Sequence, residues 1–350
     1  MSTVPKTDNV VAVLPAIAAS LTIETRLIPK PGPGEVLIRN YSIAINPVDW
    51  KRQAWGFLIP SYPVILGSDV SGVVVEVGPS VTAFKPGDRV IGYADSFLSG
   101  KNENAAFQTY TVASAKTTAK LPDKLSFEQG SLFSMAPATA SIALFDVFGL
   151  PLPTSKLTED QESSILIWGG ASAVATMAIQ FSRLLGFTVY TTVSKANHEY
   201  LKSLGASEAF DYHLPTVVDD ILSAAKQSNK PIRYVLDCVA EPQTIKYCLE
   251  VLQKSGVKGS KLATLLPPPE NETAPEGVEV GGVSGERVWN ERGDIAAWLF
   301  GQFLTDALEK GIIVPSPKIQ IVEGGIGGLQ TGMDILKKGV SATKLVVQLE

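Results

Sequence analysis

The chain has 350 residues, of which 45% are hydrophobic and 19% charged, and its formal net charge is −5 at pH 7. This composition is typical of a folded protein large enough for two domains, and it excludes an intrinsically disordered chain. Nucleic acid is not an expected partner, because binding to phosphates needs a basic surface. No membrane span is expected, since Lys, Glu, Gly or Pro interrupts each apolar run.

The cysteines and the N-terminal residues bear on location. Cys238 and Cys248 give no disulfide framework, so a reducing, cytoplasmic location is expected. The apolar residues 10–19 follow Lys6 and contain Pro15, which favours a first β-strand over a signal peptide. The chain contains no internal repeat.

The N-terminal part of the chain is predicted to be rich in β-strands. Short apolar runs alternate there with turns built from Pro and Gly, such as residues 31–34. The pattern changes near residue 127, where a helical stretch over 127–148 is expected. The strands predicted before it include residues 10–19, 35–44, 73–77 and 107–112.

Predicted strands and helices alternate from residue 164 onward. The apolar run 165–168 is typical of a strand buried on both faces of a parallel sheet, and residues 176–186 have helical spacing. This alternation predicts an α/β fold with a doubly wound parallel sheet. An amphipathic helix is expected over 295–309, and a tail strand over 344–349 is expected to return to the N-terminal domain. The other predicted strands of the parallel sheet are residues 187–193, 209–212, 234–238, 262–266 and 278–283.

The turn after residues 165–168 is a candidate nucleotide site. Its small residues would let a pyrophosphate approach the backbone at the start of a helix. Ser and Ala stand where a dinucleotide fingerprint has glycines, so a plain strand-to-helix connection is an equally good interpretation of the turn alone. The residues expected to cover the pyrophosphate are Ser172, Ala173, Val174 and Ala175.

The end of the next strand predicts which nucleotide is bound. Sites for NAD usually place Asp or Glu there, on the ribose 2′-hydroxyl. Here Ser194 and Lys195 follow the strand, and no acid occurs until Glu199. Because a hydroxyl and an ammonium suit a 2′-phosphate, NADPH is the expected cofactor. The alternative is that Lys195 is a solvated surface charge.

A series of short motifs along the chain resembles the medium-chain dehydrogenase/reductase superfamily. The resemblance covers nearly the whole chain and depends on the order and spacing of the motifs. It implies a GroES-like catalytic domain over residues 1–130, a Rossmann domain that binds NADPH over 131–290, and a return to the catalytic domain over 291–350. The motifs are residues 31–36, 46–49, 67–72, 87–90, 138–140, 172–175, 204–206 and 211–212.

Within this superfamily, the sequence resembles the branches that lack zinc. Zinc-dependent alcohol dehydrogenases carry a cysteine where this chain has residues 46–49, and Gly-His-Glu where it has 67–69. No His or Cys precedes His198, so a metal-free protein is expected. The chain is similar to quinone oxidoreductases and enoyl reductases, and most similar to the trans-acting enoyl reductases that serve fungal polyketide synthases. The motifs behind that similarity are residues 46–51, 148–153 and 193–197.

The resemblance implies reduction of a C=C bond conjugated to a carbonyl, with NADPH donating hydride. Lys51 is expected to stabilise the enolate oxygen or to donate the proton, with Asp49 as its orienting partner. The alternative is that Asp49 and Lys51 form a purely structural pair. The alternative role of Thr139 is helix packing. The alternative for Tyr212 is that it is an ordinary half-buried strand residue. The cofactor residues implied are Asn46, Pro47, Val48, Asp49, Thr139, Ser194, Lys195, Asn197, Tyr212, Leu265, Leu266 and Lys344, together with the turn 172–175.

Three functions are consistent with these features. The first is an enoyl reductase of secondary metabolism whose acyl substrate is carried by a polyketide synthase. The second is a quinone or enone oxidoreductase for free small molecules, and the third is a catalytically silent NADPH-binding protein. Lys51 favours chemistry over the third function. A monomer is expected, because the loop 267–277 could shield the sheet edge through which many relatives dimerise.

Overall fold

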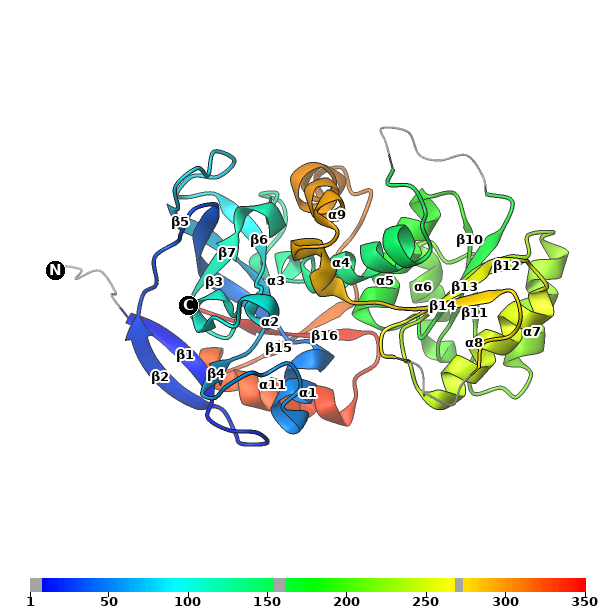
Figure 1. The fold of residues 1–350 in the computed structure, drawn as a ribbon, viewed down its shortest axis with the longest axis horizontal. Helices are drawn as coiled ribbons and strands as arrows, with labels where there is room; N and C mark the ends of the chain where they lie inside the picture. Colours follow the sequence, from blue (N-terminus) through cyan, green and yellow to red (C-terminus); the bar gives the residue numbers. More distant parts are fainter. Residues whose placement is uncertain (1–7, 154–160, 268–272) are drawn as a thin grey trace. The chain divides into compact units, whose positions relative to one another are not determined.

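The structure is a computed structural model that describes residues 8–153, 161–267 and 273–350. These residues form two compact units (Figure 1). The β-rich unit joins Met1–Met135 to Trp289–Glu350, and the α/β unit is Ala136–Val288. The sequence predicted domain limits after residues 130 and 290, and the assignment of a catalytic and a cofactor-binding domain on either side of them stays a prediction.

Two sheets build the β-rich unit. Their strands are β1 Asp8–Leu14, β2 Thr22–Leu27, β3 Glu35–Ala44, β4 Val64–Ile65, β5 Asp69–Val77, β6 Arg89–Tyr93, β7 Tyr110–Ser114, β8 Thr118–Lys120, β15 Lys318–Val322 and β16 Thr343–Gln348. The larger sheet has the order β15-β16-β3-β5-β6-β8, with β7 also paired to β3, and the smaller has the order β2-β1-β4. The inward-facing Val, Ile and Leu side chains of both sheets share one core.

The tail strand enters the sheet as the sequence predicted. β16 pairs antiparallel with β3, with Val346 opposite Ala44, and parallel with β15. It is therefore an inner strand of a sheet whose other members come mostly from the first 120 residues (Figure 1). The helices of this unit are α1 Pro47–Trp55, α2 Ser96–Ser99, α3 Phe127–Gly130, α9 Gly293–Trp298, α10 Leu304–Glu309 and α11 Leu329–Lys338.

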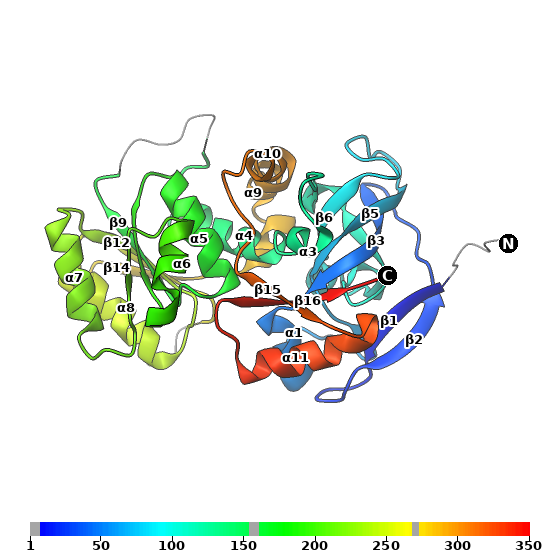
Figure 2. The same ribbon diagram turned by 180° about the vertical axis from the view of Figure 1, so that it is seen from behind.

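The α/β unit contains the predicted doubly wound sheet. Its strands are β9 Ser164–Trp168, β10 Thr188–Thr192, β11 Glu208–Phe210, β12 Ile232–Asp237, β13 Ser260–Thr264 and β14 Val278–Gly282. All pairings are parallel, and the order β11-β10-β9-β12-β13-β14 is that of a Rossmann fold. Its helices are α5 Ala173–Leu184, α6 His198–Leu204, α7 Val217–Gln227 and α8 Pro242–Ser255. Helices α5 and α6 cover one face of the sheet and α7 and α8 the other (Figure 2). Because both faces are covered, every residue of β9 is buried.

The helical stretch predicted over residues 127–148 is interrupted. The chain forms α3, a non-helical link over 131–134, α4 Met135–Ser141 and then a π-helical turn, Ile142–Val147. Serine hydroxyls compete with the helical backbone in the link: Ser131 Oγ donates to the Glu128 carbonyl and Ser134 Oγ to the Gly92 carbonyl. A second π-helical turn, Leu299–Phe303, joins α9 to α10 within the predicted helix 295–309.

Among the described residues, one largely helical stretch, Phe127–Val147, has the length and apolar composition of a membrane span, although residues 131–134 interrupt it. Of the most apolar part of this stretch, 83% is buried inside the protein, as is usual for a core helix of a globular fold. The loop 267–277, which was predicted to shield an edge of the sheet, lies partly outside the described residues. Its described part leads into the edge strand β14.

Candidate active site

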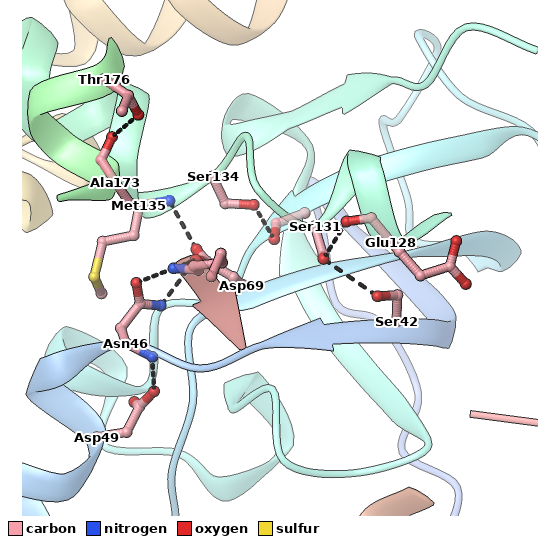
Figure 3. A network of polar contacts seen from close by, with 12 residues as sticks. Ser42, Asn46, Asp49, Asp69, Glu128, Ser131, Ser134, Met135, Ala173 and Thr176 are labelled. Carbon is pink, nitrogen blue, oxygen red and sulfur yellow. Dashed lines mark hydrogen bonds and ion pairs between the residues drawn. The ribbon is translucent and has the colours of Figure 1, made fainter. Parts of the chain in front are cut away.

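Asp69 is the centre of a buried polar cluster in the β-rich unit. Its Oδ2 accepts hydrogen bonds from Asn46 Nδ2 at 2.8 Å and from Lys344 Nζ at 3.1 Å. Its Oδ1 accepts one from the backbone N–H of Met135 at 2.8 Å (Figure 3). Lys344 also donates to Asn46 Oδ1. The side chains of Lys344 and Asp69 are 4% and 0% exposed, so each charge depends on these partners for its stability.

Strand pairing brings the three side chains of this cluster together. Asp69 opens β5 opposite Ala44, the last residue of β3. The backbone N–H of Ile45 donates to the Leu345 carbonyl at 3.0 Å, which aligns the start of β16 with the same end of β3. Asn46 and Lys344 therefore become neighbours although 298 positions separate them in the chain.

Asp49 lies in the first turn of α1 and is fully buried. Its Oδ2 accepts a hydrogen bond from the backbone N–H of Asn46 at 2.8 Å, which fixes the start of the helix (Figure 3). The other carboxylate oxygen has no hydrogen-bond partner among the described residues. The pKa of Asp49 is raised from 3.8 to about 7, chiefly by burial and also by the nearby Asp69, which together outweigh the opposing effects of the Asn46 N–H, Arg52 and Lys344.

Lys51 stands two residues further along α1 and is half-buried. Its ammonium nitrogen lies 5.8 Å from the ring centroid of Trp50 and 5.9 Å from that of Trp55. Burial lowers its pKa. The expected pairing with Asp49 is not formed: within the described part of the chain, no carboxylate lies at ion-pair distance from Lys51. Helix geometry explains this result, because side chains two residues apart point in different directions.

In the α/β unit, the turn between β9 and α5 requires glycine at its first residue. Gly169 has a φ of +77°, and a Cβ there would stand 2.6 Å from Val239 Cγ2, so only glycine fits without strain. Ser172 caps α5, and its hydroxyl accepts a hydrogen bond from the backbone N–H of Ala175 at 3.2 Å. The helix therefore begins at Ala173, and the positive end of its dipole lies beside the turn.

The end of β10 presents polar side chains beside the end of β11. The backbone N–H of Val193 donates to the Phe210 carbonyl, so the residues that follow the two strands run side by side. The Lys195 side chain is exposed and has no hydrogen-bond or ion-pair partner among the described residues. Asn197 Nδ2 donates to Ser194 Oγ at 3.3 Å, and the half-exposed Tyr212 ring packs 4.1 Å from the ring of His213.

The remaining predicted residues occupy three places. Thr139 is buried within α4. Leu265 and Leu266 follow β13, and Leu266 is 37% exposed. Pro47 and Val48 form the first turn of α1. The structure thus gathers residues 46–51 with Lys344 in the β-rich unit, and residues 172–175 and 194–212 at the ends of β9, β10 and β11 in the α/β unit.

Asp69 is the functional candidate that the sequence prediction missed. It was noted only as part of the segment that replaces a zinc-binding motif. A signal was available, because Asp69 is a carboxylate that stands shortly before the predicted strand 73–77. Such a charge needs a cation nearby, and the one found is Lys344.

The donor set at residues 46–69 does not fit a zinc ion. Positions 46 and 68 carry Asn and Ser, and the Asn46 and Asp69 oxygens already accept hydrogen bonds from the Lys344 ammonium. Within residues 8–153, 161–267 and 273–350, no three His, Cys, Asp or Glu side chains gather as metal ligands do.

Together, the β-rich unit and the Rossmann unit define a class: a two-domain oxidoreductase with a GroES-like domain and a nucleotide-binding domain. Family models support both parts, "Alcohol dehydrogenase GroES-like domain" over residues 32–123 and "Zinc-binding dehydrogenase" over 173–258. The chain belongs to the medium-chain dehydrogenase/reductase superfamily, as its sequence motifs predicted.

Named relatives match nearly the whole chain. It is 37% identical to "Trans-enoyl reductase tndF" of Aspergillus flavipes, over 98% of this chain and 99% of that one. It is 36% identical to "Trans-enoyl reductase himH" of Aspergillus japonicus, over 90% of each chain. Among solved structures, that of mycobacterial Rv1454c complexed with NADPH has the same fold, with a TM-score of 0.76 at 22% identity, over 97% of this chain and all of that one.

Proposed function

We propose that this oxidoreductase is an NADPH-dependent reductase of C=C bonds conjugated to a carbonyl, acting in trans on unsaturated acyl chains made by a polyketide synthase. The observation that carries the proposal is Lys51, a half-buried ammonium of lowered pKa that has no carboxylate partner among the described residues. The relatives named trans-enoyl reductase support the substrate class.

The reaction asks two things of the protein after substrate binds. When bound, NADPH supplies hydride to the β-carbon of the acyl group. Negative charge then builds on the carbonyl oxygen, and the α-carbon must gain a proton. The Lys51 ammonium stabilises that oxygen, and its lowered pKa makes its proton easier to transfer at neutral pH. Asp49 contributes as a positioning residue, because its carboxyl fixes the start of the helix that carries Lys51.

For the cofactor, we propose that the edge formed by the ends of β10 and β11 holds the 2′-phosphate. Lys195 supplies an unpaired ammonium, and Ser194, Asn197 and Tyr212 supply further polar groups beside it. The pyrophosphate would lie beside residues 172–175 at the start of α5, at the positive end of the helix dipole, where the Ala175 N–H already donates to Ser172 Oγ. Thr139, Leu265, Leu266 and residues 46–48 remain proposed contacts of the nicotinamide half.

Zinc has no part in the proposed reaction. Residues 46 and 68 lack the sulfur and imidazole groups that hold catalytic zinc, and the oxygens of Asn46 and Asp69 are bonded to an ammonium. Reduction of a conjugated C=C bond is compatible with this site, because hydrogen-bond donors can stabilise the enolate oxygen.

The test compares two substrates and two variants. Oxidation of NADPH is followed with a crotonyl thioester and, separately, with a simple quinone. Turnover of the thioester supports the enoyl reductase, whereas turnover of the quinone alone supports a quinone oxidoreductase. If neither substrate is turned over although NADPH binds, the protein does not reduce free substrates, and the same assay with the acyl group on a carrier domain decides between a trans-acting enzyme and a silent protein.

The phosphate site is tested by Lys195→Ala, with the exposed Lys226→Ala of the same unit as its control. Loss of a charge-assisted hydrogen bond is worth about 1.5–3 kcal/mol, so the Kd for NADPH should rise about 10–100-fold in Lys195→Ala. The Kd for NADH should not change in either variant. Equal weakening of both cofactors would contradict the assignment of Lys195 to the 2′-phosphate.

A further inference from the structure

Lys344 is the most deeply placed lysine in the described part of the chain to carry an ion pair. Its side chain is 4% exposed, and that of its partner, Asp69, is fully buried. The other ion-paired lysines have side chains between 27% and 77% exposed. A buried ion pair gains little stability from the charges alone, since desolvation of two ions opposes their attraction. The burial of the Lys344–Asp69 ion pair therefore needs an explanation other than a contribution to overall stability.

The ammonium of Lys344 orders two groups at once. It donates to Asn46 Oδ1 and to Asp69 Oδ2, while Asn46 Nδ2 donates to the same carboxylate oxygen. With the lysine in place, only one orientation of the Asn46 amide satisfies all three contacts, because the amide oxygen must face the ammonium and the amide nitrogen the carboxylate. Asn46 precedes Pro47 at the start of α1, and its N–H is bound by Asp49.

We propose that Lys344 is a positioning residue whose ammonium acts as a built-in cation. It joins Asn46 to Asp69, which lie in the segments that hold the ligand positions in zinc-dependent relatives. By holding Asn46, it fixes the start of α1, the helix that carries Lys51. A cation of this kind organises neighbouring oxygens as a metal ion would, but it is covalently attached through β16. Lys344 thereby acts on the reaction through Asn46 and the helix. Only the effect of Lys344 on the reaction rate rests on the proposed function. The structural role of the ammonium in the cluster does not, because the cluster belongs to the fold of the β-rich unit.

Chemical rescue gives a direct test. Lys344→Ala removes three methylenes and the ammonium, a fragment with the shape of propylammonium. The thermal unfolding midpoint of the cofactor-free variant should fall, and added propylammonium should restore much of the loss. 1-Propanol, which has nearly the same shape without the charge, should restore none of it. Equal effects of the amine and the alcohol, or an unchanged midpoint in Lys344→Ala, would overturn the role of the charge.

A second set of variants keeps the test decisive if Lys344→Ala does not fold. Lys344→Arg keeps the charge and should retain a midpoint near that of wild type. Lys344→Met should lower the midpoint much more in the wild-type background than together with Asp69→Asn, because the double variant leaves no unpaired charge. The exposed Lys337→Met is the matched control for loss of a positive charge from the same unit. Equal losses in both backgrounds would contradict the built-in cation.

Kinetics separate a positioning role from a direct contact with the cofactor. If Lys344 positions α1, its alanine variant should lose roughly tenfold or more in kcat, the loss seen when outer-shell partners of a cation site are removed, and propylammonium should restore kcat. If Lys344 only bound the cofactor, the Kd for NADPH would rise while kcat and the midpoint of the cofactor-free protein stayed unchanged. Because the unfolding midpoint is measured without substrate, failure of the enoyl reductase activity and failure of the built-in cation give different results.

Discussion

Replacement of Asp49 by Asn should make the protein more stable above neutral pH. In the folded state, burial raises the pKa of this carboxyl from 3.8 to about 7. The folded protein therefore binds more protons than the unfolded chain between these values, and the contribution of Asp49 to the free energy of unfolding falls as pH rises from about 4 to 7. At about 1.36 kcal/mol per pKa unit, the full loss is about 4 kcal/mol above pH 7.

The asparagine side chain keeps what Asp49 provides and removes the charge. Its carbonyl oxygen can still accept the hydrogen bond from the Asn46 N–H, the one contact that fixes the helix start. Its amide nitrogen takes the place of the oxygen that has no partner among the described residues, so it leaves an unpaired donor that costs roughly 1–3 kcal/mol. The net gain at pH 8 should therefore be about 1–3 kcal/mol.

Guanidinium unfolding at several pH values between 5 and 8 measures this effect. The difference in unfolding free energy between Asp49→Asn and wild type should grow by about 2.5 kcal/mol over that range. Asp88→Asn is the control, because hydrogen bonds from Lys85 and Lys120 lower the pKa of Asp88 and its carboxylate is ionised throughout this range. A difference for Asp49→Asn that stays constant with pH, as that for Asp88→Asn should, would refute the raised pKa.

Three further predictions concern the two units and the assembly. Lys51→Met keeps the packing on Trp50 and Trp55 and should lower kcat about 100-fold, whereas the control Lys116→Met, at an exposed position, should leave kcat unchanged. A wild-type kcat in Lys51→Met would show that Lys51 takes no part in catalysis. Gly169→Ala should lower the stability of the α/β unit by roughly 1–2 kcal/mol because of the positive φ at this residue, and by a further amount because the new Cβ meets Val239. Val239→Ala should relieve only the second contribution, so thermal unfolding of the single and double variants separates backbone strain from the steric clash. Light scattering should return the 37.2 kDa mass of one chain, and twice that mass would contradict the expected monomer.

The sheet of the α/β unit could be predicted because its signals are local. Apolar runs such as residues 165–168 need no partner to be recognised, since a strand covered on both faces is apolar throughout. The break in the stretch 127–148 could not be predicted in the same way. It depends on Ser134 reaching the Gly92 carbonyl and on Asp69 accepting the Met135 N–H, and both partners are distant in sequence.

In the candidate site, too, the residues recognised from local sequence could be predicted, and those that depend on distant partners could not. Ser172 and Lys195 were identified from their place after a strand, a property of the local sequence. The environment of Asp49 could not be inferred, because its burial and the nearby Asp69 follow from the packing of the whole β-rich unit. The two-residue spacing to Lys51 suggested a pair that the helix does not form. Lys344 was placed near the site by resemblance alone, and its two partners emerged only from the pairing of β16 with β3.

The central place of β16 affects the order in which the protein folds during synthesis. The α/β unit is one continuous segment and can fold once residue 288 has left the ribosome. The β-rich unit must wait for residues 343–348, because the end of β3 at Ser42–Ala44 has no neighbour on that side until β16 arrives, although β7 already pairs with Glu35–Arg39. The 298 residues between Asn46 and Lys344 take about 15–60 s to synthesise at 5–20 residues per second. During that time Asp69 has no lysine partner and an inner strand has an open edge, so this is the interval in which a nascent chain most needs protection by chaperones.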